Sequence, residues 1–161
     1  MNTLIADHFT YFRFEEDFVD DNVRCIPMIV RFKLDACGIK LKLAEWSKMT
    51  PEERTSLAVS PCYTSLEVEQ YRSSLIDLIH ERTGNDATEL PLTENPVWEN
   101  LEDIPYPLQE KLKELNYSVA LEQWQQLSNL QRFALLKLSY PGHENKNFPK
   151  AMKEFNLINE N

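Results

Sequence analysis

The feature that most constrains the fold of this chain is an internal repeat. Residues 26–57 align with residues 104–135 without a gap, at an offset of 78 positions. Eight aligned positions are identical: Ile26/Ile104, Pro27/Pro105, Lys33/Lys111, Leu34/Leu112, Leu43/Leu121, Trp46/Trp124, Arg54/Arg132 and Leu57/Leu135. Because helix-capping residues coincide as well, a duplication explains the match more simply than chance. We therefore expect two related helical halves.

The first copy predicts three helical steps in succession. Pro27 starts the first helix, because proline suits the opening turn. Gly38 ends it, because glycine adopts the left-handed conformation that closes many helices. A short helical segment follows. The pair Thr50 and Glu53 then forms a capping box, which opens a third helix over about 51–59.

The second copy predicts the same steps. Pro105 opens its first helix, and Asn116 ends it, since asparagine also tolerates the left-handed conformation. Ser128 and Gln131 form the capping box of the third helix, over about 129–139. The segments before each tryptophan are ambiguous, because Ile39 to Leu43 alternate as a strand would and their counterparts do not. We expect both segments to be mainly helical.

Two further helices are predicted outside the repeat. A helix over about 65–83 begins at a capping box, keeps apolar residues three to four apart and stops at Gly84. A last helix, over about 148–156, follows a Pro-Gly turn and has Pro149 in its first turn. The chain has only 3 glycines, which disfavours folds built on tight turns or glycine-rich loops. The predicted fold class is all-α.

The length of 161 residues favours one domain with four parts. We expect an aromatic N-terminal arm over 1–23, whose rings pack on the main body. The first repeat half covers 24–84, an acidic connector covers 85–103, and the second half covers 104–157.

The charge of the chain excludes several classes of function. Its formal net charge is -9, which argues against binding nucleic acid. No apolar run is long enough to span a membrane, and the first ten residues do not resemble a signal peptide, so we expect a cytoplasmic protein. The acidic residues concentrate in 63–103. This belt is either a solvated face or a docking surface for a basic partner.

The segment after the Pro-Gly turn is the best candidate for a functional loop. Five consecutive polar residues precede the last helix there: His143, Glu144, Asn145, Lys146 and Asn147. Functional residues often lie in such loops, and a histidine can bind metal or carry a proton near neutral pH. The structural alternative is a plain turn in which Asn147 caps the last helix.

The cysteines allow a second chemistry. Cys25, Cys62 and His143 would form a metal site if the fold brought them together, although their spacing matches no known signature. Buried, inert thiols are the simpler interpretation, and Cys37 is expected in the core. A cysteine–histidine catalytic pair with His80 or His143 has no supporting motif.

Six residues of the repeat are assigned structural roles: Pro27, Trp46, Arg54, Pro105, Trp124 and Arg132. Because the two arginines recur at matched positions, we expect each to anchor its half by bonding carbonyl groups at a helix end.

Several blocks of the sequence resemble the nitrate reductase-associated protein family. The resemblance rests on these segments: Arg24-Cys25-Ile26-Pro27-Met28, Arg31-Phe32-Lys33-Leu34-Asp35, Gly38-Ile39-Lys40-Leu41-Lys42-Leu43, Pro61-Cys62, Glu81-Arg82-Thr83-Gly84, Leu121-Glu122-Gln123-Trp124, Leu130-Gln131-Arg132-Phe133-Ala134-Leu135 and His143-Glu144-Asn145-Lys146-Asn147-Phe148. They extend over nearly the whole chain, from about residue 12 to 157.

The resemblance implies a non-enzymatic accessory factor of assimilatory nitrate reductase. Its partner would be the reductase or the maturation machinery of that enzyme, with no cofactor of its own. The family supplies no catalytic residues to transfer. The alternative is a small metal- or cofactor-handling protein that uses Cys25, Cys62 and His143. A sensor of nitrogen status is a third option, without a visible ligand motif.

Overall fold

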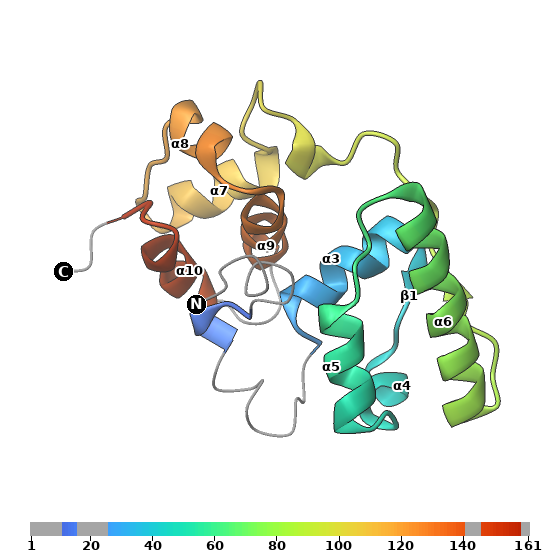
Figure 1. Ribbon diagram of the computed structural model, residues 1–161. Coiled ribbons are helices and arrows are strands. Elements are labelled where there is room, and N and C mark those ends of the chain that lie inside the picture. The colour runs from blue at the N-terminus through green and yellow to red at the C-terminus, as the bar shows by residue number, and fades with distance from the viewer. Residues whose placement is uncertain (1–10, 16–25, 141–145, 159–161) are drawn as a thin grey trace, which may run out of the picture. The chain divides into compact units, whose positions relative to one another are not determined.

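The computed structural model describes residues 11–15, 26–140 and 146–158 (Figure 1). Over these residues the chain is mostly helical, with eight α-helices, two short 3-10 helices and one two-stranded sheet. The predicted all-α class is therefore confirmed, apart from the small sheet. The elements are η1 (Arg13–Glu15), α3 (Met28–Cys37), β1 (Ile39–Lys40), α4 (Leu43–Ser47), α5 (Pro51–Val59), α6 (Ser65–Thr83), β2 (Thr88–Glu89), η2 (Val97–Glu99), α7 (Tyr106–Glu114), α8 (Leu121–Gln126), α9 (Asn129–Ser139) and α10 (Asn147–Glu154).

The chain divides into two compact units, of which the first ends at Leu92 and the second begins at Thr93. The first unit contains η1, helices α3 to α6 and the sheet. The second contains η2 and helices α7 to α10. No helix within the described ranges is both long and apolar enough to cross a membrane.

Helix α3 supplies the core of the first unit. Ile29 and Val30 on this helix are almost completely buried, and so are Leu75 and Ile79 on α6. Helix α3 packs against both α5 and α6. Its first turn is closed by the buried carboxylate of Glu15, which accepts hydrogen bonds from the amides of Met28 at 2.8 Å and Phe12 at 3.2 Å. A carboxylate suits this place because the amino end of a helix is partially positive.

The helical expectation for residues 39–43 was wrong for the first part of that segment. Ile39 and Lys40 form β1, which pairs antiparallel with β2, so that Ile39 faces Glu89. Helix α4 begins only at Leu43. The alternating pattern was the better guide, because the segment buries Ile39 on one side and exposes Lys40 on the other. The counterpart segment, 117–120, is not helical either.

Local capping interactions account for the bounds of α5 and α6. The Thr50 hydroxyl accepts a hydrogen bond from the Glu53 amide at 3.1 Å, and the Glu53 carboxylate accepts one from the Thr50 amide at 2.8 Å. The equivalent pair at the start of α6 is Thr64 and Glu67. Gly84 ends α6 with a φ of 74°. The predicted bounds of both helices are confirmed.

The second unit is organised around α9, which packs against η2, α7 and α10. Phe133 on this helix is buried and meets the Trp98 ring edge-on, with 6.0 Å between ring centroids. Helix α10 begins at Asn147, with Lys146 before it and no side-chain cap. The alternative in which Asn147 caps this helix was therefore wrong, because Asn147 is its first residue and is buried.

The three helices of each repeat copy begin at corresponding positions. Met28 and Tyr106 start α3 and α7, Leu43 and Leu121 start α4 and α8, and Pro51 and Asn129 start α5 and α9. Each pair is separated by 78 positions, as the sequence alignment has it. Pro27 and Pro105 lie directly before the first helix of their copy, one residue outside the turn in which they were predicted. The origin of the two copies by duplication stays a prediction.

Candidate partner-binding surfaces and the cysteine site

The predicted loop at 143–147 is described only at its end. His143, Glu144 and Asn145 lie outside the described residues. Lys146 is exposed, whereas Asn147 is only 5% exposed at the start of α10. Of these five residues, the structure therefore places Lys146 on the surface and buries Asn147 at the start of the last helix.

The cysteine–histidine metal set is described at one position only. Cys25 and His143 lie outside the described residues, so their distance from Cys62 stays open to test. Cys62 is buried, and its Sγ lies 3.8 Å from the Lys33 carbonyl oxygen. Burial raises the pKa of the Cys62 thiol to about 12. Because the thiolate is the form that binds metal, coordination by Cys62 would have to displace the thiol proton.

Two other candidate groups, Cys37 and His80, fall within the described residues. Cys37 is buried, as predicted, and its thiol donates toward the Leu34 carbonyl at 3.6 Å. His80 is exposed on α6. Within the described ranges, no three His, Cys, Asp or Glu side chains are grouped so that they could hold a metal ion.

Arg54 holds the carboxyl end of α4. Its Nε donates to the Trp46 carbonyl at 3.1 Å, and its Nη2 donates to the Ser47 carbonyl at 3.0 Å. The guanidinium carbon also lies 5.8 Å from the centroid of the buried Trp46 ring. A cation at this place suits the partially negative end of a helix.

Arg132 makes the corresponding contacts at the end of α8. Its Nη1 donates to the Trp124 carbonyl at 3.3 Å and to the Gln125 carbonyl at 3.4 Å. Its Nε donates to the Trp98 carbonyl at 2.8 Å, which ties η2 to the helix pair. The guanidinium carbon lies 5.9 Å from the Trp124 ring centroid. Both arginines thus bond carbonyl groups at the end of a short helix.

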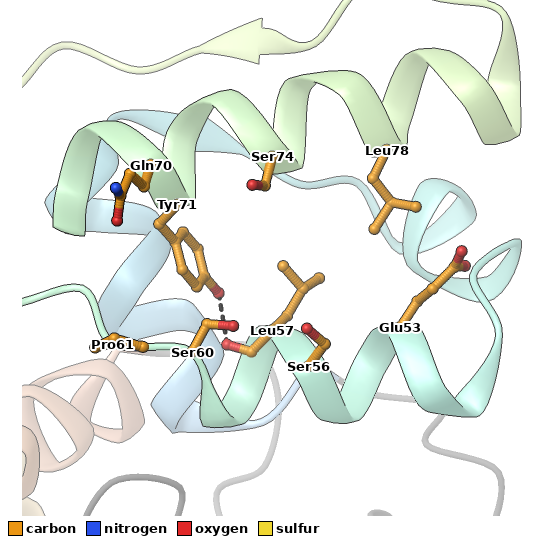
Figure 2. Close-up of a pocket in the computed structure, with 9 residues that line it drawn as sticks. All are labelled: Glu53, Ser56, Leu57, Ser60, Pro61, Gln70, Tyr71, Ser74 and Leu78. Carbon is orange, nitrogen blue, oxygen red and sulfur yellow. Dashed lines mark hydrogen bonds between the residues drawn. The ribbon is translucent and has the colours of Figure 1, made fainter. Parts of the chain in front are cut away.

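A groove between α5 and α6 is a surface that the sequence analysis missed (Figure 2). It has a volume of about 280 Å³. Its lining residues are Glu53, Ser56, Leu57, Ser60, Pro61, Gln70, Tyr71, Ser74 and Leu78. Tyr71 is buried between the two helices, and its hydroxyl donates to the Leu57 carbonyl at 2.8 Å. The groove thus combines apolar side chains, Leu57 and Leu78, with hydroxyl and amide groups, a composition suited to binding.

Part of this groove was visible in the sequence. Gln70 and Ser74 are four apart on α6 and share one face of that helix, whereas Ser56 lies on α5 and Ser60 directly follows the end of that helix. Nothing in the sequence indicated that the two faces oppose each other. At one end of the groove, Glu53 accepts hydrogen bonds from Arg82, and this contact lowers the pKa of the Glu53 carboxyl to about 2.

The exposed face of α6 is acidic. Its two arginines are paired, Arg72 with Glu89 and Arg82 with Glu53. Glu69, Asp77 and Glu81 are exposed, and Asp77 and Glu81 are neighbours on the helix surface because they lie four residues apart. This face is the helical part of the acidic belt that the sequence predicts.

A second groove lies in the second unit, between α7 and the end of α9. It has a volume of about 570 Å³. Two exposed tyrosines line it, Tyr106 at 70% and Tyr140 at 48% exposure. Lys111 lies in the same groove and pairs with Glu114 at 3.1 Å. Tyrosine is enriched at protein interfaces because it presents a large apolar ring together with a polar tip.

Comparison with known proteins identifies a family match. A family model described as conserved nitrate reductase-associated protein matches residues 11–155. The matched range extends over both compact units. No curated protein and no solved structure matches the chain.

Proposed function

Because the chain belongs to the family of conserved nitrate reductase-associated proteins, we propose that it is a non-enzymatic accessory protein of assimilatory nitrate reductase. The observation that carries this proposal is the extent of the family match, from residue 11 to residue 155. The accessory role requires recognition of another protein. We place it in the cytoplasm, where such an enzyme and its maturation factors would meet it.

The exposed surface offers places for protein contact. Tyr106 and Tyr140 line a groove and are 70% and 48% exposed. Such aromatic side chains often dominate the energy of protein interfaces. The segment from His143 to Asn147 begins three residues after Tyr140 in the sequence. We propose that this segment, together with the tyrosine groove, forms the docking surface for the reductase or its maturation machinery.

The role of the repeat in this proposal is structural. Pro27, Trp46 and Arg54 set the helices of the first copy, and Pro105, Trp124 and Arg132 set those of the second. In our proposal a duplication produced this pair of scaffolds, whose exposed faces then diverged. The accessory step is assembly or maturation of the reductase, or maintenance of its active conformation.

The experiment that tests this function is a native pull-down. The tagged protein is recovered from nitrate-grown source cells, and the eluate is examined by mass spectrometry and by elemental analysis. We expect nitrate reductase in near-stoichiometric amount. An eluate without reductase but with bound transition metal would instead favour the alternative, a metal-handling protein that uses Cys25, Cys62 and His143. An eluate with neither would contradict both functions.

A replacement strain tests the predicted docking segment. The variant His143→Ala with Lys146→Ala should lower nitrate reductase activity in cell extracts while the accessory protein accumulates normally. The matched control is Lys42→Ala with Lys48→Ala, which removes two exposed side chains of the first unit. Wild-type reductase activity in the first strain would contradict the proposed segment.

A further inference from the structure

Helix α10 presents a row of lysines on its outward face. Lys146 directly precedes the helix, and Lys150 and Lys153 follow at spacings of four and three. Residues at these spacings lie on the same side of a helix. All three side chains are exposed. We call Lys146, Lys150 and Lys153 the lysine row.

The opposite face of α10 holds the lysine row in place. Phe148, Ala151 and Met152 are fully buried, and Phe155 just beyond the helix is 6% exposed. Helix α10 packs against α9, which is the centre of the second unit. Because rotation of α10 would expose this apolar face to water, the three amines stay on the outer surface of a packed helix.

The lysine row keeps an excess of positive charge within the described part of its unit. Among the described residues, none of the three amines forms an ion pair or a hydrogen bond. With Lys146 included, helix α10 contains three lysines and one acidic residue, Glu154 at its end. Lys33 and Lys111 differ from the lysine row, because both are buried and their amines donate hydrogen bonds to oxygen atoms. The row is therefore a local positive surface on a chain whose net charge is -9.

We infer that the lysine row docks on an acidic patch of the partner protein. This inference rests on the proposed accessory function and adds a defined surface and a required charge on the partner. The row is continuous with the predicted docking segment, because Lys146 belongs to both. Three lysines on an acidic chain do not suit nucleic acid, whose binding draws on many cations facing successive phosphates.

Exposed charges of this kind act mainly on the rate of association. Opposite charges on two surfaces steer the encounter of two proteins, and changing them alters the association rate and its salt dependence. The contribution of each exposed ion pair to the final affinity is small. The lysine row should therefore accelerate docking at low salt and lose that effect as salt rises.

The test compares two charge reversals in binding to nitrate reductase purified from the same source. The first variant is Lys146→Glu with Lys150→Glu and Lys153→Glu. The matched control is Lys40→Glu with Lys42→Glu and Lys48→Glu, which changes the net charge equally in the first unit. In stopped-flow or biosensor measurements at low salt, we expect the first variant to associate about tenfold more slowly than the control. A glutamine version of the first variant should lie in between.

The outcomes separate the inference from the function on which it rests. Equal association rates and equal salt dependence for the lysine-row variants and the wild type would overturn the inference and leave the accessory function standing. An equal loss in both reversal variants would also overturn it, because only net charge would then matter. If the wild-type protein does not bind the reductase at all, both proposals fail. Binding of the wild type, but not of the variant, to a mixed-sequence RNA would replace the protein partner by a nucleic acid.

Discussion

Lys33 is a buried lysine whose amine closes the carboxyl end of α5. Its Nζ donates to the carbonyl oxygens of Ala58 and Ser60, each at 2.6 Å, while the Tyr71 hydroxyl takes the Leu57 carbonyl. The last carbonyls of a helix have no partner within the helix, and leaving them unbonded in the core would be costly. Two other helices thus supply the donors that α5 lacks.

Burial of this amine predicts a pH dependence of stability. Burial lowers the pKa of Lys33 to about 8, below the value of 10.5 expected when unfolded. Between these pH values the unfolded chain binds more protons, so stability rises with pH. We expect the unfolding free energy of the wild type, relative to Lys33→Met, to increase by about 2 kcal/mol from pH 8 to 10. Urea titrations of both proteins at several pH values measure this, and parallel pH profiles would contradict it.

The burial of Cys37 and Cys62 predicts low thiol reactivity in the native protein. Burial raises the pKa values of both Cys37 and Cys62, and the thiolate is the reactive form. We expect both residues to resist iodoacetamide at pH 8 in the native protein and to react in urea. Peptide mass spectrometry reads each site separately. Rapid native labelling of Cys62 would contradict its burial and would favour the alternative in which it is a metal ligand.

At the scale of elements, two helix ends depend on glycine. Gly38 and Gly84 have φ values of 72° and 74°, a region that side chains disfavour. A Cβ at Gly84 would meet no atom within 4 Å. A Cβ at Gly38 would lie 3.0 Å from Leu92 Cδ2 and 3.1 Å from the Leu90 carbonyl oxygen. A side chain at Gly84 is therefore disfavoured by backbone conformation alone, whereas one at Gly38 is also disfavoured by lack of space.

This difference predicts two distinct costs of the same substitution. Gly84→Ala should destabilise the protein by about 1 kcal/mol, the cost of a left-handed residue with a side chain. Gly38→Ala should cost more, because the backbone of residue 90 must also move. Thermal or urea unfolding of the two variants measures the order. Equal losses of stability would show that Leu92 and the backbone of residue 90 move aside at no cost in free energy.

The helix ends were predictable because their causes are local. The capping pairs Thr50 with Glu53 and Thr64 with Glu67 lie three residues apart, so the sequence alone shows both partners. The pairing of β1 with β2 was not predictable in this way, since the partner strand lies beyond α6. The burial of Lys33 was also hidden, because a lysine in an amphipathic helix usually points to water.

At the scale of the whole molecule, candidate sites formed by one helix were predictable from the sequence, and sites formed by distant segments were not. The lysine row could be recognised from spacing once the last helix was placed, because one helix contains all of it. The α5–α6 groove could not, since it needs two helices whose facing sides the sequence does not pair. The Cys25, Cys62 and His143 set required three distant segments to converge, and no local pattern can establish that.

The division of the chain into two units predicts where a protease cuts between them. Residues 91–95 are five consecutive exposed positions at the junction, and Leu92 is 67% exposed. Exposed backbone outside a helix or strand is the preferred substrate of proteases. Limited digestion with thermolysin should therefore cleave within 90–96, while the nineteen-residue helix α6 stays intact. Mass spectrometry of the early products locates the cut, and the control variant Leu92→Pro should slow it. If α6 were cut as early as residues 90–96, the exposed junction would not be the weak point of the first unit, and the boundary at Leu92 would have no physical meaning.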